Sequence, residues 1–133
     1  YDACDHSRHS KGMSGSSNFP AYLARFGLFS GSLLYLRTKP KRGVRTIAVP
    51  GMDHPICMRT GTSDRSAFNE VIIKGWYDFP FPAGQPRLII DAGANVGYAS
   101  VRFAELYPQA DIIAIEPDAE NFALIERNIA PYP

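Results

Sequence analysis

The sequence predicts an α/β fold in which a β-α-β-α unit occupies residues 87–133. Two apolar runs, "RLIID" (87–91) and "DIIAIEP" (111–117), have the length and composition of buried parallel strands, covered on both faces. Each run is followed by a stretch of helical periodicity. The 133 residues, with 45% hydrophobic and 20% charged side chains, suit one ordinary globular domain at most.

The segment before this unit divides into a tail and a folded lead-in. Residues 1–18 are rich in Ser, Gly, His and Asp, and we expect them to be disordered. Residues 19–86 begin with two predicted helices, "PAYLARFG" (20–27) and "LFSGSLLYLR" (28–37), in which Pro20 suits a first turn and Gly27 a stop. Two short strands follow in "VRTIAVPG" (44–51) and "HPICMR" (54–59), which predict a hairpin.

A third helix is predicted in "TGTSDRSAFNEVIIKG" (60–75). Thr62 or Ser63 can cap its start, and Gly75 suits its exit. One face of this helix is apolar and should pack on a sheet, through Ala67, Phe68, Val71 and Ile72. The proline-rich stretch 76–86, "WYDFPFPAGQP", then reads as a connector to the C-terminal unit.

The C-terminal unit contains two more predicted helices. In "YASVRFAELYP" (98–108), the spacing places Arg102 and Glu105 on the solvent side. "DAENFALIERNIA" (118–130) opens on Asp118 as an N-cap and carries an apolar stripe of Phe122, Ile125 and Ile129. Two parallel strands are too few for a complete doubly wound sheet. We therefore expect either an N-terminal portion of a longer protein or a fragment whose open sheet edge needs a partner and can self-associate.

A glycine loop, "DAGANVG" (91–97), follows the first predicted strand of the unit. Asp91 and Glu116 end the two strands, and ligands of open α/β sheets bind at these carboxyl ends. Glu116 follows Gly97 by nineteen residues, close to the spacing of an acid that accepts ribose hydroxyls. The alternative is that Glu116 only caps the next helix, although that helix already has Asp118. The ribose role is the better interpretation.

The residues of the loop do not match those required to bind a dinucleotide. The G-x-G-x-x-G fingerprint, aligned on Gly93, would place Asn95 and Tyr98 where glycines are required, and Tyr98 would crowd a pyrophosphate. Asp91 also adds negative charge beside the turn. A ligand with an amino group and no phosphate fits these residues better.

These motifs resemble those of class I S-adenosylmethionine-dependent methyltransferases, and more closely the FkbM-type family. "IDAGANVGYAS" (90–100) and "IAIEPDAENFALIERNI" (113–129) resemble its hallmark, and "MRTGTSDRSAFNEVIIKGWYD" (58–78) resembles its lead-in. The resemblance implies a truncated Rossmann-like fold with S-adenosyl-L-methionine as cofactor. It implies cofactor contacts at the loop and the second strand end, from Asp91, Gly93, Ala94, Asn95, Gly97, Glu116, Pro117 and Asp118.

Within that resemblance the residues take different roles. Asp91 would organise the loop towards the methionine end, and Glu116 would bind the ribose hydroxyls. Pro117 and Asp118 would shape the pocket near adenosine. The methionine side would be closed by Ser63, Asp64, Glu70 and Tyr77. For Glu70 and Tyr77, packing and helix solvation are an equal alternative. No catalytic residue is identified, because the acceptor's base in this fold usually comes from later strands.

The leading functional hypothesis is O-methyl transfer to a small-molecule or sugar hydroxyl. The alternatives are a non-catalytic binding or assembly module and an NAD-dependent oxidoreductase.

Nucleic acid is not expected as a partner, since "KPKRGVR" (39–45) lacks interleaved aromatic residues. No bilayer-length apolar run or leader is found, so we expect a cytoplasmic protein. Cys4, His6 and His9 lack a fourth ligand and predict no metal site.

Overall fold

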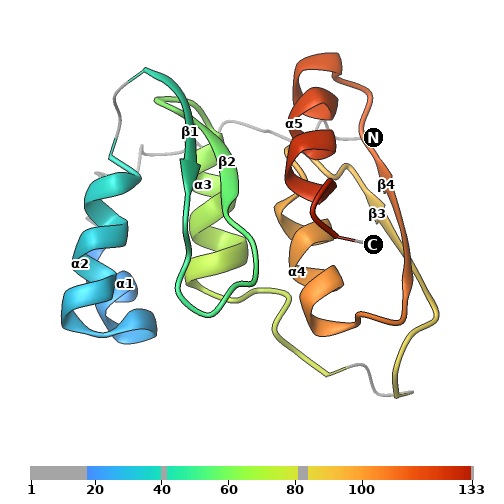
Figure 1. The fold of residues 1–133 in the computed structure, drawn as a ribbon, viewed down its shortest axis with the longest axis horizontal. Coiled ribbons are helices and arrows are strands. Elements are labelled where there is room, and N and C mark those ends of the chain that lie inside the picture. Colours follow the sequence, from blue (N-terminus) through green and yellow to red (C-terminus); the bar gives the residue numbers. More distant parts are fainter. Residues whose placement is uncertain (1–17, 40–41, 81–83, 133) are drawn as a thin grey trace, which may run out of the picture.

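The structure is a computed structural model that describes residues 18–39, 42–80 and 84–132. The expected tail, including Cys4, His6 and His9, lies outside these residues except for Asn18. Helices and short strands follow in the predicted order, and the fold is a mixed α/β one with two small sheets. Figure 1 shows the elements side by side, from a pair of helices at one end to a parallel two-stranded sheet at the other.

The first layer is the helix pair α1 (Phe19–Phe26) and α2 (Leu28–Arg37). Pro20 lies in the first turn of α1, and Gly27 separates the helices with a φ of 76°, which favours glycine. The helices cross closely at Gly31, where an added Cβ would lie only 2.4 Å from the carbonyl oxygen of Tyr22. The predicted helices and their glycine stop are confirmed.

The second layer is a hairpin with a helix against it. Strands β1 (Gly43–Ile47) and β2 (Ile56–Thr60) pair antiparallel, with Ile47 opposite Ile56. The predicted third helix is divided into α3 (Asp64–Phe68) and a π-helical turn, η1 (Asn69–Ile73). The wider turn coincides with burial of Asn69, whose Oδ1 accepts a 2.7 Å hydrogen bond from the Tyr22 hydroxyl. Helical periodicity alone does not predict that polar contact.

The C-terminal unit has the predicted β-α-β-α order. It consists of β3 (Leu88–Ala92), α4 (Tyr98–Leu106), β4 (Asp111–Ile115) and α5 (Ala119–Ile129). The strands are parallel, with Asp91 opposite Ala114 and Ala92 opposite Ile115. α4 and α5 lie between the hairpin and this sheet (Figure 1).

The expectation that both faces of the parallel strands are covered is wrong for the described residues. α4 covers one face, where Ile89 packs with Phe103 and Tyr107. The other face is open, and Leu88 and Ile90 are 54% and 59% exposed. The apolar runs indicated strands correctly, but composition cannot show which neighbours are present to cover them.

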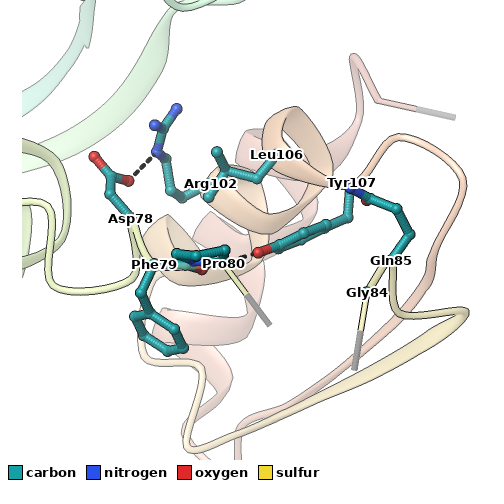
Figure 2. Close-up of a pocket in the computed structure, with 8 residues that line it drawn as sticks. All are labelled: Asp78, Phe79, Pro80, Gly84, Gln85, Arg102, Leu106 and Tyr107. Atoms are coloured by element: carbon teal, nitrogen blue, oxygen red, sulfur yellow. Dashed lines mark hydrogen bonds and ion pairs between the residues drawn. The ribbon is translucent and has the colours of Figure 1, made fainter. Parts of the chain in front are cut away.

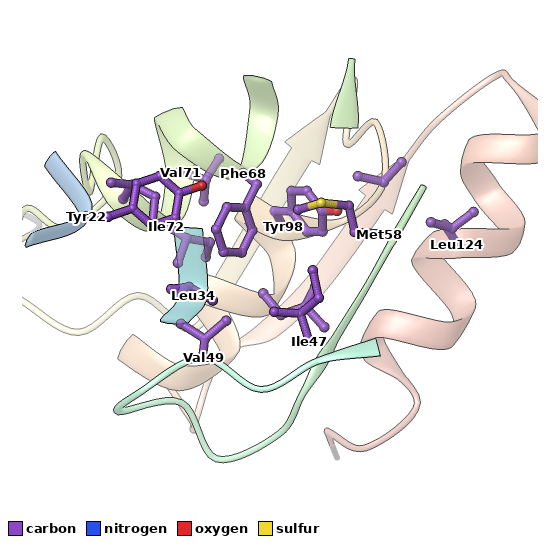
Figure 3. Packing of buried hydrophobic residues seen from close by; sticks show 13 residues of the cluster. Tyr22, Leu34, Ile47, Val49, Met58, Phe68, Val71, Ile72, Tyr98 and Leu124 are labelled. Carbon is purple, nitrogen blue, oxygen red and sulfur yellow. The ribbon is translucent and has the colours of Figure 1, made fainter. Parts of the chain in front are cut away.

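The main core joins the two halves of the chain. Side chains of α1, α2, the hairpin, α3 and η1 pack with Val96 of the glycine loop, Tyr98 at the start of α4 and Leu124 of α5 (Figure 3). Tyr98 meets Phe68 edge-on, with ring centroids 5.9 Å apart. The glycine loop therefore rests on a wall built by the N-terminal residues.

The buried face of α5 differs from the predicted stripe. Ile125 is buried as expected, but Phe122 and Ile129 are 44% and 38% exposed. The face turned to the core carries Leu124, Ile125 and Asn128. Asn128 was not part of the expected stripe; it is buried where its side chain contacts backbone groups of β2 and of the glycine loop, and periodicity does not reveal that contact.

Candidate functional site

The glycine loop folds over the carboxyl end of β4. The amides of Gly93 and Ala94 donate to the Ile115 carbonyl at 2.9 and 3.0 Å, and the Gly97 amide donates to the Ala94 carbonyl at 2.8 Å. Gly93, Asn95 and Gly97 have φ values of 80°, 53° and 82°, in the left-handed region that glycine and asparagine tolerate. The sequence predicts the turn correctly, and these contacts fix its shape.

Asp91 is the penultimate residue of β3, just before the loop. Its Oδ2 accepts a 2.6 Å hydrogen bond from the hydroxyl of Ser100, which is buried in the first turn of α4. The carboxylate thus ties the strand end to the helix, in keeping with an organising role. Ser100 was not predicted as its partner.

Glu116 follows directly after β4 and touches both the loop and α5. Its Oε2 accepts from the Asn95 amide at 2.8 Å, whereas Oε1 accepts from the Asp118 amide at 3.1 Å. Ligand binding and helix capping, weighed as alternatives from the sequence, are both compatible with this position. Because each carboxylate oxygen can accept two hydrogen bonds, Oε2 retains acceptor capacity.

Asp118 caps α5 as predicted, since its Oδ1 accepts from the Asn121 amide at 2.8 Å. Pro117 and Asp118 are exposed on the same rim as the half-buried Glu116. The structure therefore gathers the predicted residues from the end of β3, the loop and the end of β4 into one rim, namely Asp91, Gly93, Ala94, Asn95, Gly97, Glu116, Pro117 and Asp118.

Asn128 connects the loop to the hairpin and was missed by sequence reasoning. The side chain is 2% exposed, and its Nδ2 donates to the Val96 carbonyl at 2.8 Å. Its Oδ1 accepts from the Cys57 amide at 2.7 Å, and its Nδ2 also approaches the Cys57 carbonyl at 3.2 Å. A polar residue within an apolar helix face was the only sequence signal for this contact.

Of the residues expected around the methionine side, Asp64 has a different role. It is fully buried, and it accepts hydrogen bonds from the backbone amide and the guanidinium of Arg59. A carboxylate enclosed in this way is a structural partner of Arg59 and is not available to a ligand.

The amino end of α4 is enclosed. Val96 and Tyr98 are almost inaccessible, and the Tyr98 hydroxyl donates to the Cys57 carbonyl at 3.2 Å. Burial raises the pKa of Tyr98 well above its ordinary value. The Tyr98 side chain points into the core. The expectation that this side chain would crowd a pyrophosphate is therefore wrong.

A surface cavity of about 530 Å³ lies at the other end of α4 (Figure 2). Three of its polar side chains are already engaged: Arg102 pairs with Asp78, and the Tyr107 hydroxyl donates to the Phe79 carbonyl at 3.0 Å. The cavity is lined by the connector and by α4, through Asp78, Phe79, Pro80, Gly84, Gln85, Arg102, Leu106 and Tyr107. It does not include any residue of the glycine-loop rim.

Fold and site together define an α/β protein with a glycine loop and an acidic residue at the carboxyl ends of two parallel strands. The chain is similar to "Methyltransferase 1" of Beauveria bassiana (strain ARSEF 2860), at 38% identity over 61 residues, 45% of this chain and 24% of that relative. It is also similar to "Methyltransferase sdnD" of Sordaria araneosa, at 36% identity over 63 residues, 47% of this chain and 24% of that relative.

The chain thus spans about a quarter of the length of these curated relatives. Both are fungal methyltransferases, and the likeness supports a methyltransferase relationship in general terms. No family model matches the chain, and no solved structure matches it. Among the described residues, none of the helices is long and apolar enough to traverse a bilayer.

Proposed function

We propose that the chain is the cofactor-binding portion of an S-adenosylmethionine-dependent methyltransferase of FkbM type, with a Rossmann-like class I fold. The observation that carries this proposal is the contact between Glu116 and the loop. The carboxylate lies at the end of β4 with Oε2 2.8 Å from the Asn95 amide, beside the exposed backbone of Gly93. An acid in this place can accept both ribose hydroxyls of a nucleoside.

The residues of the rim fit S-adenosylmethionine in their chemistry. Glu116 would hold the ribose, Asp91 would face the methionine end, and Gly93 would let the backbone approach the ligand. A Cβ added at Gly93 meets no atom within 4 Å, so the space beside it is open. When bound, the cofactor supplies a methyl group on a sulfonium, which is electrophilic.

The acceptor we propose is a hydroxyl group of a small molecule or sugar, in line with the FkbM resemblance. This chain's own residues bind and orient the cofactor, and we assign no catalytic residue. His54 packs edge-on against Tyr132, with ring centroids 5.1 Å apart, so packing accounts for its position. The absence of glycine at positions 95 and 98 favours this proposal over an NAD-dependent oxidoreductase, because the dinucleotide fingerprint requires glycine there.

Calorimetric titration of the chain with S-adenosylhomocysteine and with NAD tests the proposal. We expect S-adenosylhomocysteine to bind and NAD not to bind. The Glu116→Ala variant should bind S-adenosylhomocysteine at least about tenfold more weakly, because hydrogen bonds to a charged group are lost. Glu126→Ala removes an exposed acid of α5; this variant is the control and should bind normally.

Three results would count against the proposal. Binding of NAD alone would favour the oxidoreductase, and binding of neither ligand would favour the non-catalytic module. Unchanged affinity in Glu116→Ala would reject the ribose role of this residue.

A further inference from the structure

A chain of side-chain hydrogen bonds runs from the hairpin to Glu116. It starts at Arg59 of β2, whose Nη2 donates to Asn121 Oδ1 at 2.5 Å. The Nδ2 of Asn121 then approaches Glu116 Oε1 at 3.4 Å, a long hydrogen bond. Neither Arg59 nor Asn121 was among the site residues predicted from the sequence.

Arg59 is a fixed anchor for this chain of contacts. Its Nε and Nη2 lie 3.0 and 2.9 Å from the two carboxylate oxygens of Asp64, a bidentate pair with a fully buried partner. The hydrogen bond to Asp64 raises the pKa of Arg59, so the guanidinium stays charged. The Asp64 amide in turn approaches Thr62 Oγ1 at 3.2 Å, which fixes the start of α3.

The orientation of the Asn121 amide follows from its two neighbours. A guanidinium can only donate hydrogen bonds, and an ionised carboxylate can only accept them. The amide satisfies both only with its oxygen towards Arg59 and its NH₂ towards Glu116. The backbone of Asn121 is held separately, because its backbone N–H donates to Oδ1 of the Asp118 cap. The side chain is therefore free to act on Glu116 without being needed for the cap.

We propose that Asn121, anchored by Arg59, is a positioning residue that orients the Glu116 carboxylate towards the ribose of the bound nucleoside. The proposal rests on the proposed function, which assigns the ribose to Glu116. The Asn121 side-chain amide joins the Asp118 backbone amide in holding Oε1 on the side of α5, at 3.4 and 3.1 Å, and Oε2 then points to the loop, where it meets the Asn95 amide. A carboxylate held before the ligand arrives loses less side-chain entropy on binding.

The test uses Asn121→Leu, which removes the polar amide and keeps the Arg59–Asp64 pair. We expect the affinity for S-adenosylhomocysteine to fall about fivefold, the worth of one ordinary hydrogen bond. Glu120→Ala is the matched control. Glu120 neighbours Asn121 and lies 3.7 Å from Arg59 Nη1, but its side chain is 88% exposed, so binding should not change.

A second ligand separates positioning from a general structural effect. The 2′,3′-dideoxy analogue of S-adenosylhomocysteine lacks the hydroxyls that Glu116 would accept. If Asn121 acts through Glu116, then Asn121→Leu weakens binding of S-adenosylhomocysteine and leaves binding of the analogue unchanged, as followed by NMR titration. Equal weakening of both ligands overturns the positioning role, because it shows a general disturbance of the fold.

Two further outcomes are distinguishable. If the unaltered chain binds S-adenosylhomocysteine and Asn121→Leu binds it equally well, the role of Asn121 is overturned and the proposed function stands. If the unaltered chain binds neither ligand, the proposed function is overturned and the role of Asn121 falls with it.

Discussion

The two glycines of the loop have the same backbone conformation but different surroundings. Gly93 and Gly97 have φ values of 80° and 82°, where an added Cβ is unfavourable in either case. Beside Gly93 the space is open, whereas a Cβ at Gly97 would lie 3.3 Å from the Cα of Ile125 in α5. Gly97 is thus required both by the turn and by the approach of α4 to α5.

We therefore predict that Gly97→Ala destabilises the fold more than Gly93→Ala. Gly93→Ala should lower the free energy of unfolding by about 1–2 kcal/mol through backbone strain alone. Gly97→Ala should cost about 1–3 kcal/mol more, since the backbone of α5 has to move. Urea denaturation of both variants measures the difference, and equal losses would show that the contact with α5 is unimportant.

Residue-scale features that depend on near neighbours could be predicted from the sequence. The Asp118 cap and the turn at Gly93 and Gly97 are examples, because caps and tight turns depend on residues a few positions apart. The partners of Asp91 and Glu116 could not be predicted in the same way. Ser100 and Asn121 are ordinary helix residues, and only the packing of α4 and α5 shows which way they point.

At the scale of elements, α4 is held by ion pairs on the side expected to face solvent. Asp78 of the connector pairs with Arg102 of α4, at 2.5 Å from its Nε, and also with Arg25 of α1. The Glu105 side chain is 8% exposed and accepts from the Asp53 amide at 3.0 Å and the Tyr132 hydroxyl at 2.9 Å. The prediction of a solvent-facing pair is wrong because the hairpin turn and connector pack beside this helix.

The Asp78 contacts predict a dependence of stability on pH. Burial disfavours its charged form, but the hydrogen bonds from Arg102 and Arg25 outweigh burial and lower the pKa of Asp78. A carboxyl with a lowered pKa stabilises the fold above its unfolded pKa of about 3.9. This stabilisation is lost as the pH falls through the lower pKa of the folded state.

We expect Asp78→Asn to lower the free energy of unfolding at pH 7 by at most about 1 kcal/mol, because solvent screens the pairs. The difference from the unaltered chain should shrink as the pH falls below about 4. Urea titrations across acidic pH measure it, with Asp111→Asn, an exposed acid of β4, as a control expected to show little effect. A difference that persists unchanged in acid would show that Asp78 acts by packing.

At the scale of the whole molecule, the parallel sheet forms an outer layer with one uncovered face (Figure 1). On that face Leu88, Ile90, Ile113 and Ile115 are each about half exposed, at 54%, 59%, 49% and 52%. Within the described residues each strand pairs on one side only. Apolar faces and unpaired edges favour association with other chains.

We predict that the chain self-associates through this sheet. The double variant Ile90→Lys, Ile113→Lys should sediment as a monomer at concentrations where the unaltered chain does not. Phe29→Lys is the control, since Phe29 is 83% exposed on α2 at the other end of the molecule. If only Phe29→Lys reduces association, the helix pair is the interface and the sheet is not.

The order of elements could be predicted because apolar runs, caps and glycine stops are local signals. The relation between the halves could not, because it depends on contacts such as Tyr98 with Phe68 and Asn128 with Cys57. Residues 19–86 read from the sequence as a lead-in to the site. In the structure they build part of its wall.

The packing of the glycine loop against residues 19–86 matters for any attempt to shorten the chain. Val96 and Tyr98 belong to the loop and the first turn of α4, yet they are buried among side chains of α1, α2, the hairpin, α3 and η1. A peptide that began at residue 87 would retain the whole "DAGANVG" motif. It would lose the side chains of residues 19–86 against which the end of this loop packs. The motif is short and contiguous in the sequence, but its conformation depends on contacts with residues far away in the chain.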